Sequence, residues 1–192
     1  DIGTTSFYPT KNLGAYGDGG AIFTNNDDLA QQIKMYSNHG ESKRYHHDII
    51  GINSRLDSIQ AEVLNVKLKY LTNYNQARNQ MANIYNDAFK DIIELQIPFK
   101  LCNSTHVFHQ YTLKVQNGKR DDLIKYLDQN GIDNRVYYPI PVHKQKAFSK
   151  YSSINLINTD VLATSCLSLP IHTEIENSSQ KYIIDNVLNF FK

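Results

Sequence analysis

The spacing of apolar residues predicts a strand followed by a helix near the start of the chain. Residues 21–24 form a short strand-like run, and Asn25 or Asn26 is placed to cap a helix with an acidic first turn. One face of that helix is apolar and carries Leu29, Ile33 and Tyr36. We expect Gly40 to end the helix. Because strand–helix units belong to sheets with crossover helices, the pattern predicts an α/β fold.

Two longer helical patterns occupy the middle of the chain. The first is a stripe formed by Leu56, Ile59, Val63, Leu64, Leu68 and Leu71. The second continues toward Phe89, ends before Pro98, and consists of Tyr74, Ala77, Met81, Tyr85 and Ala88. Apolar stripes of this kind cover a hydrophobic core, so we expect both helices to face one.

The last third of the chain has the pattern of a compact α/β unit. We predict strands at 107–115 and 132–138, and helices at 121–130, 159–168 and 177–192. Gly131 lies just past the end of the first of these helices, where glycine is favoured. In the last helix, Asn177 and Gln180 are spaced as a capping box.

Composition and charge exclude several classes of protein. The net charge of the 192 residues is +1, which gives no electrostatic footprint for a nucleic acid. No apolar run approaches the roughly 20 residues that cross a membrane. Cys102 and Cys166 are too few for a disulfide framework, and we expect reduced thiols, one in a loop and one at a helix end. We therefore expect a soluble, cytoplasmic protein without nucleic-acid or membrane partners.

Residues 41–53 form a polar stretch whose histidines raise the question of a metal site. The candidate ligands are His39, His46, His47 and Asp48. Adjacent histidines on a loop rarely point to one site, and the helical spacing of a zinc protease is absent. The sequence therefore favours a mobile polar loop and no metal.

Residues 6–20 hold a concentration of glycines next to one lysine. The segment is SFYPTKNLGAYGDGG, in which Lys11 follows an apolar and aromatic run that ends at Pro9. Four glycines follow within seven residues, namely Gly14, Gly17, Gly19 and Gly20. Glycine lets a backbone take positive φ or approach another group closely, so this density indicates a tight loop that leaves room for a ligand.

Three interpretations of Lys11 compete. Most lysines are solvated, and a lysine near a turn needs no function. A P-loop is disfavoured because its glycines precede the lysine and open a helix, whereas here they follow the lysine and lead into a strand. The third interpretation is a Schiff-base lysine, whose amine attacks a carbonyl from a partly buried loop.

The segment resembles the pyridoxal-phosphate lysine motif of the DegT/DnrJ/EryC1/StrS sugar aminotransferases. The resemblance spans nearly the whole chain and rests on SFYPTKNLG at 6–14, GDGGA at 17–21, NHG at 38–40, GINSRLD at 51–57, YYPIPVH at 137–143 and LPIH at 169–172. It implies an α/β fold-type I aminotransferase. The implied domains are the end of the large cofactor domain at 1–71, a linking helix at 72–91 and a small α/β domain at 92–192.

The resemblance also implies the cofactor and the residues that hold it. Lys11 forms the Schiff base with pyridoxal 5'-phosphate and, once released, moves a proton at the substrate carbon. Ser6 holds the cofactor phosphate through its hydroxyl. Asn53 matches the asparagine that reaches the phosphate of the neighbouring subunit, which implies a homodimer with shared sites. Some relatives replace the lysine by histidine and are dehydrases, so Lys11 favours transamination.

Further matches concern the substrate. His39, Tyr138 and His143 match positions near the substrate sugar or nucleotide in relatives. For Arg55, a phosphate or substrate contact and a structural salt bridge both remain open. Tyr137 stands where many members have histidine, and Ser37 stands where arginine often precedes the Asn-His-Gly triplet. These departures leave the identity of the substrate open.

The implied activity is transfer of an amino group from glutamate, or glutamine, to a keto group of a nucleotide-linked sugar, for polysaccharide or glycoconjugate synthesis. In the resemblance, the motif KNLGAYGDGG favours amination at C3 of the sugar over C4. The alternative is a non-catalytic regulatory or interaction module that keeps the fold, which the joint presence of Lys11, Ser6 and Asn53 disfavours. We expect the chain to be the second half of a longer protein, with the missing cofactor contacts before Asp1, and to be inactive alone.

Overall fold

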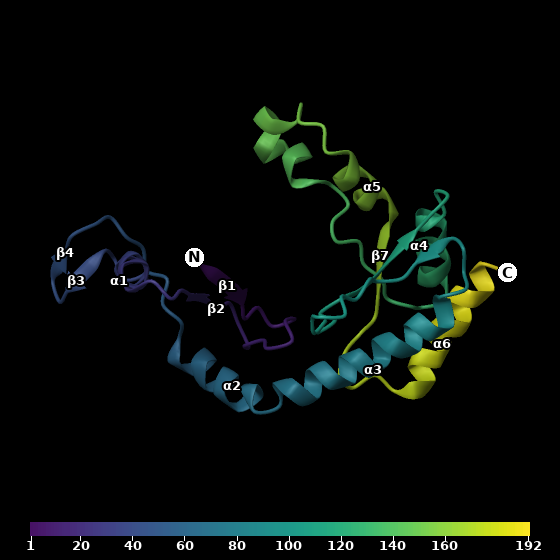
Figure 1. Cartoon of the computed structure of the whole chain (residues 1–192), viewed down its shortest axis with the longest axis horizontal. Coiled ribbons are helices and arrows are strands. Elements are labelled where there is room, and N and C mark those ends of the chain that lie inside the picture. Colours follow the sequence, from purple (N-terminus) through teal and green to yellow (C-terminus); the bar gives the residue numbers. More distant parts are fainter. The chain divides into compact units, whose positions relative to one another are not determined.

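The computed structural model describes residues 1–192 and divides into two compact units, Asp1–Asn73 and Tyr74–Lys192 (Figure 1). None of the helices combines the length and the apolar composition that a membrane-spanning segment requires. The unit boundary lies inside a long helix, α3 (Leu71–Phe89). Assignment of the units to the domains that the resemblance implies stays a prediction.

The first unit is built from short strands and two helices. In chain order these are β1 (Gly3–Ser6), β2 (Gly20–Phe23), α1 (Asp27–Tyr36), β3 (Glu41–Lys43), β4 (His46–His47) and α2 (Ser58–Leu68). Strand β1 pairs antiparallel with β2, and β3 pairs antiparallel with β4. The polar segment that was expected to be a loop is therefore in part a small hairpin.

The predicted start of α1 is confirmed and its end needs a correction. The side chain of Asn26 accepts a hydrogen bond from the amide of Leu29 at 3.0 Å, which satisfies an otherwise unpaired first-turn donor. The helix ends at Tyr36 with Ser37 as its C-cap residue, and Gly40 lies beyond it with a φ of 75°. Gly40 therefore shapes the turn after the helix and does not terminate it.

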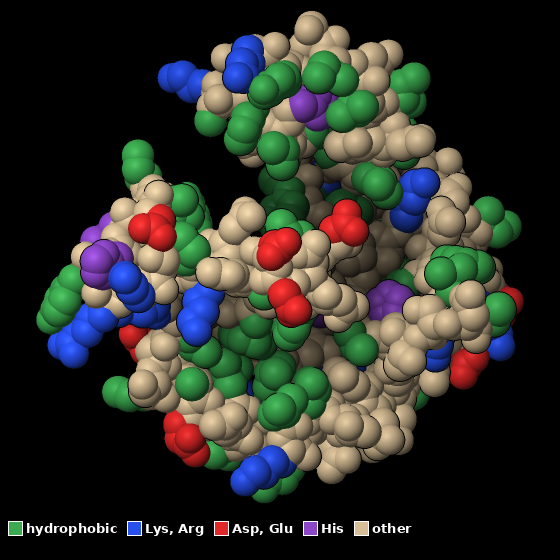
Figure 2. Space-filling view, turned by 60° about the vertical axis from the view of Figure 1, so that its left-hand side comes forward, with side chains coloured by type: hydrophobic (Ala, Val, Ile, Leu, Met, Phe, Trp, Pro, Cys, Tyr) green, Lys and Arg blue, Asp and Glu red, His purple; other side chains and the backbone are tan.

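The stripe predicted to bury α2 is largely exposed. Only Leu64 is buried, whereas Ile59 is 78% and Leu68 is 55% exposed. Apolar side chains also reach the surface in the space-filling view (Figure 2). The prediction that the whole stripe faces a core is wrong for this unit, because two-stranded sheets with exposed residues offer little surface to pack against.

The second unit contains a three-stranded antiparallel sheet in the order β5–β6–β7. Its elements after α3 are β5 (Leu95–Gln96), β6 (Tyr111–Val115), α4 (Arg120–Gln129), η1 (Val142–Lys144), η2 (Lys146–Tyr151), α5 (Ile157–Ser165), β7 (Cys166–Leu169) and α6 (Asn177–Phe190). Burial alternates along β6, so one face of that strand enters the core. Helices α3 and α6 lie side by side (Figure 1).

The core of this unit is rich in aromatic residues. Helix α3 contributes Met81, Tyr85 and Phe89, and Tyr85 lies against Tyr111 of β6 with ring centroids 4.8 Å apart. The remaining buried core residues include Leu113, Leu123, Leu127, Leu167, Ile183 and Val187. The helical period predicted for α3 is confirmed, since Met81 and Tyr85 of its predicted face are buried. The helix predicted at 121–130 is confirmed as α4.

Three predictions in this unit are wrong. Residues 132–138 form no strand and contribute only an isolated bridge between Arg135 and Ser168. The predicted helix at 159–168 ends at Ser165, and Cys166–Leu169 is the fully buried strand β7. No side chain caps α6; Gln180 is buried and donates to the carbonyl of Met81 at 2.8 Å. Its role is to join α6 to α3.

The ion pair between Glu94 and Lys119 makes stability depend on pH. Lys119 Nζ donates to the Glu94 carboxylate at 2.9 Å, and this bond is the largest cause that lowers the pKa of Glu94. A carboxylate whose pKa is lower in the folded than in the unfolded state stabilises the fold at pH values above the unfolded-state pKa. This contribution is lost as the pH falls through the folded-state pKa. Glu94→Gln is therefore expected to lower the free energy of unfolding at about pH 6 and to have little effect at about pH 3.

Urea unfolding at both pH values measures this difference. Glu174→Gln, at an exposed position, is the matched control. An equal difference between wild type and Glu94→Gln at the two pH values would show that the ion pair is not its cause.

Candidate active site

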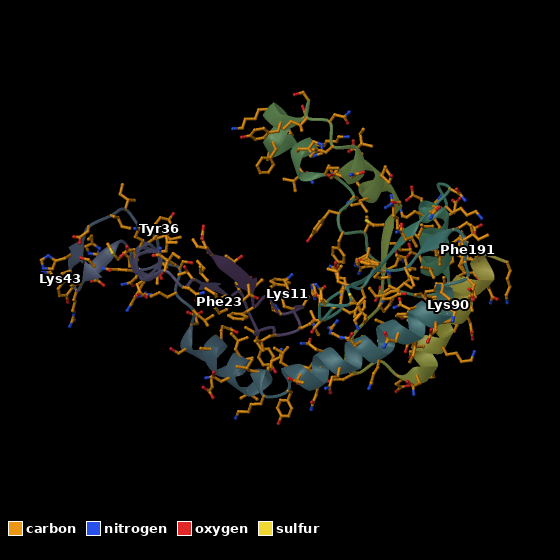
Figure 3. All side chains as sticks on the ribbon, viewed as in Figure 1. Lys11, Phe23, Tyr36, Lys43, Lys90 and Phe191 are labelled. Atoms are coloured by element: carbon orange, nitrogen blue, oxygen red, sulfur yellow. The ribbon has the colours of Figure 1, made fainter.

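Lys11 lies in the loop that joins β1 to β2, at the end of a hydrogen-bonded turn (Figure 3). Its amide donates to the carbonyl of Tyr8 at 2.9 Å, with Pro9 at the second position of the turn, where proline is favoured. The hydroxyl oxygen of Ser6 accepts from the amide of Tyr8 at 3.2 Å. Lys11 itself is half-buried. Lys11 is therefore the last residue of this turn, and Ser6 lies two residues before its first residue.

The glycines of this loop serve the packing of the loop itself. A Cβ at Gly14 would lie 2.5 Å from the carbonyl oxygen of Pro9, and one at Gly20 would lie 2.9 Å from that of Thr5. None of the four loop glycines has a positive φ. The tight loop is confirmed, since Gly14 and Gly20 let segments of the same chain approach closely. The expectation that the glycines also leave room for a ligand stays a prediction.

Asn53 belongs to a network of hydrogen-bonded side chains. Its carbonyl oxygen accepts from Arg55 Nε at 3.1 Å, and Arg55 also donates to Asn38 Oδ1 at 3.3 Å. Asn38 in turn donates to Glu41 at 2.9 Å. Arg55 thus makes hydrogen bonds to two amides and no salt bridge. With its oxygen engaged, the exposed Asn53 side chain keeps two N–H donors.

His39 lies beside this network and has an exposed side chain. Its backbone has a φ of 59°, its amide donates to Ile52, and its carbonyl contacts His47 Nδ1 at 3.0 Å. Asn38 and Asn53 form a bridge next to it. The chain contains no group of three His, Cys, Asp or Glu side chains that could hold a metal ion.

Tyr138 and His143 lie in the second unit. Tyr138 is 70% exposed, and its ring meets the edge of Tyr137 with centroids 5.5 Å apart. His143 is half-buried in η1, and its Nε2 is buried without a hydrogen-bond partner. Such an unpaired ring nitrogen suits contact with a polar ligand group.

Each unit contains more than one open cavity, of which one in each unit is lined by residues of the matched motifs. The cavity of the first unit, about 560 Å³, is lined in part by Thr5, Gly19, Gly20 and Arg55, and neither Ser6 nor Lys11 reaches it. The cavity of the second unit, about 260 Å³, is lined in part by His109, Arg135, Tyr137 and Ser168.

Asn38, which connects Arg55 to Glu41, was missed by sequence reasoning, although it lies inside the matched triplet at 38–40.

Comparison with protein families decides what this lysine loop is part of. The model of the DegT/DnrJ/EryC1/StrS aminotransferase family matches residues 1–188. The chain belongs to this family. Its fold is the α/β fold-type I fold of pyridoxal-phosphate aminotransferases, and pyridoxal phosphate is the cofactor of the family.

Individual relatives support the same membership. A "Pleiotropic regulatory protein" from Geobacillus stearothermophilus is 39% identical over 98% of this chain and 51% of its own length. A UDP-2-acetamido-2-deoxy-3-oxo-D-glucuronate aminotransferase from Pseudomonas aeruginosa is 39% identical over 98% and 51%. The structure of NtdA from Bacillus subtilis with bound PMP is 30% identical, with a TM-score of 0.92, and covers 100% of this chain and 46% of that one. The chain spans about half the length of the curated relatives it matches.

The residues of the lysine loop fit two ends of the cofactor. A half-buried amine suits an aldehyde carbon, and a hydroxyl donor suits a phosphate oxygen. Ser6 accepts one hydrogen bond from the turn, and its hydroxyl also carries a hydrogen that can be donated. The Asn53 amide offers two more donors without adding charge. The donor set of the first unit therefore fits the aldehyde and phosphate groups.

Proposed function

We propose that the full-length protein is an aminotransferase that moves an amino group from glutamate, or glutamine, to a keto group at C3 of a nucleotide-linked sugar. The observation that carries the proposal is the turn that holds Ser6 and Lys11 together, within a chain that matches the family over residues 1–188. The lean to C3 is supported by the relative from Pseudomonas aeruginosa, whose name specifies a 3-oxo sugar. The product would serve polysaccharide or glycoconjugate synthesis.

The side chains of the loop have separate tasks in this proposal. When bound, pyridoxal phosphate supplies the electron sink for breaking the bond to a proton at the substrate carbon. The Ser6 hydroxyl donates its hydrogen to the phosphate and so fixes the distance of the ring from the turn. The Lys11 amine, once free, takes the proton from the substrate carbon and delivers it to the C4' carbon of the cofactor. Both tasks need the rigid turn between them.

Asn53 completes the phosphate contacts from a second copy of the chain. Arg55 donates to the amide oxygen of Asn53, which leaves the amide nitrogen of Asn53 as the donor for a ligand. We assign Arg55 chiefly to this orienting task, with a substrate contact as its second role. The active protein is then a homodimer with shared sites, in which 1–71 belongs to the large domain, 72–91 links the domains and 92–192 forms the small domain.

Three exposed or half-buried side chains are the proposed substrate contacts. His39 lies next to the Asn53 network, and His143 offers a buried ring nitrogen without a protein partner. Tyr138 exposes most of its ring, which suits stacking or hydrogen bonding to a sugar or nucleotide. We propose that these three residues recognise the nucleotide-linked sugar.

Assay of the purified full-length protein tests the proposal. It is mixed with pyridoxal phosphate, a nucleotide-linked 3-keto sugar or its 4-keto isomer, and glutamate or glutamine, and aminated products are identified by mass spectrometry. We expect an amine at C3 and no turnover by the 192-residue chain alone. Amination only at C4, or none with either donor, would contradict the proposal, and turnover by the 192-residue chain would contradict the expectation that it is incomplete.

A regulatory module is the second candidate, because one relative carries the name of a regulatory protein. A module of this kind has no need of a reactive lysine. A visible absorption band that appears when pyridoxal phosphate is added, and that requires Lys11, would favour the enzyme over the module.

A further inference from the structure

Two polar side chains of helix α2 form hydrogen bonds with the backbone of the lysine loop. Lys67 Nζ donates to the carbonyl of Gly14 at 2.5 Å, and Gln60 Oε1 accepts from the amide of Tyr16 at 2.8 Å. Lys67 also lies over the ring of Tyr16, with its Nζ 5.5 Å from the centroid. Both contacts join residues more than forty positions apart in sequence, so they are tertiary contacts and not local turn geometry.

The two side chains lie on the one face of α2 that is not solvent-exposed. Gln60, Leu64 and Lys67 follow one another at helical spacing; Leu64 is buried, and the other two are half-buried. Ala15, which lies between the two hydrogen-bonded residues Gly14 and Tyr16, is fully buried. The apolar residues on the rest of the helix are largely exposed. The side of α2 that packs is therefore the side that holds the loop.

The segment held by α2, residues 14–16, also contacts the turn that carries Lys11. The amide of Ala15 donates to the carbonyl of Phe7 at 2.8 Å, so the loop is fixed on its other side as well. Gly14 lies so close to Pro9 that a Cβ would clash with that carbonyl. A shift of residues 14–16 therefore displaces the turn Tyr8–Lys11 as well.

We propose that Gln60 and Lys67 are positioning residues, which set the place and the mobility of Lys11 by clamping residues 14–16 of its loop. This inference rests on the proposed function only for its effect on the cofactor. Its structural part, the clamp, stands on the contacts alone. Because each side chain holds one backbone group, removing either one frees one side of the same loop.

Amide hydrogen exchange in the full-length protein without cofactor tests the clamp. Gln60→Leu removes the acceptor at similar size, and Lys67→Met removes the ammonium but keeps the stem. The informative amides are those of Lys11 and Ala15, because they bond to Tyr8 and Phe7 and not to the altered side chains. We expect their exchange to accelerate on the order of tenfold in each variant, as the loss of one such hydrogen bond implies. Gln60→Glu keeps the acceptor and is expected to exchange like wild type.

Asn65→Ala, on the exposed side of α2, is the matched control for changes to the helix itself. If Gln60→Leu and Lys67→Met leave the exchange of Lys11 and Ala15 as slow as in the control, the clamp is refuted. A fall in helical circular dichroism in these variants but not in Gln60→Glu would show that the side chains are needed for folding, which also overturns a positioning role.

A second readout separates this inference from the proposed function. In the same variants, retention of added pyridoxal phosphate is expected to fall about tenfold, together with the visible band that depends on Lys11. Faster exchange without any Lys11-dependent band, even in wild type, would support the clamp and reject the proposed function. A wild-type band with unchanged exchange and retention in the variants would reject the clamp and leave the proposed function standing.

Discussion

Replacing Lys11 with alanine in the full-length protein is expected to reduce amino transfer by at least about a thousandfold, because one amine both bonds the cofactor and moves the proton. No other lysine lies in the β1–β2 loop, so no neighbouring amine on this loop replaces it. The rate of amino transfer and the visible absorption band of bound cofactor should disappear together. The fold should persist, since the backbone amide of Lys11 closes the turn by donating a hydrogen bond to the carbonyl of Tyr8.

Two further variants make this prediction specific to the amine. Lys11→Arg keeps the positive charge but does not form a Schiff base under ordinary conditions, so it should be as inactive as Lys11→Ala. Lys34→Ala, on the exposed surface of α1, should keep wild-type activity and absorption. Appreciable turnover by Lys11→Ala with unchanged absorption would mean that the lysine is an ordinary loop residue and that the chemistry lies elsewhere.

The parts of the fold that sequence reasoning predicted are those set by local rules. Asn26 caps α1 because a short polar side chain before an acidic turn satisfies a helix amide wherever the helix packs. Gly131, at a φ of 65° just past α4, likewise follows from backbone geometry alone. The lysine loop was found through its motif, which is contiguous in sequence and whose residues are held by local hydrogen bonds.

The failures occur where tertiary contacts override local preference. Gln180 has the spacing of a capping residue, but its amide is used to join α6 to α3. Cys166–Leu169 continues the apolar character of a helix, and only pairing with β6 makes it a strand. The stripe of α2 predicts burial, yet the face of α2 that packs includes the polar Gln60 and Lys67. A seven-residue spacing of two polar side chains was the only sequence signal of that face.

Arg78 is the clearest case of a residue whose importance the sequence hides, because it interrupts the apolar face of α3 with a charge. It is buried, and desolvation lowers the pKa of its guanidinium below the usual value. A single terminal nitrogen donates to the carbonyls of Phe108, His109 and Ile171 at 3.0–3.2 Å. The two hydrogens of this nitrogen serve three carbonyl acceptors, so at least one hydrogen is shared between two carbonyls. The guanidinium therefore joins α3 to the segments before β6 and after β7.

We expect Arg78→Met to lower the free energy of unfolding of the full-length protein by about 2–4 kcal/mol. The methionine restores the apolar stem, but it leaves three carbonyls that the arginine had satisfied, and unsatisfied buried acceptors cost about 1–3 kcal/mol each before relaxation or water entry. Urea unfolding, followed by circular dichroism, measures the difference. Because His109 and Ile171 also line the cavity of the second unit, that cavity should become more mobile.

Gln80→Met, two residues further along α3 and exposed to solvent, makes the matched control and should change the free energy of unfolding by less than about 0.5 kcal/mol. Removing an isolated buried charge generally stabilises a protein, whereas removing one that satisfies several carbonyls destabilises it. The sign of the change therefore distinguishes the two cases. A more stable Arg78→Met variant would mean that the desolvation cost of the guanidinium exceeds the value of its three bonds, and that packing of apolar residues alone holds these segments against α3.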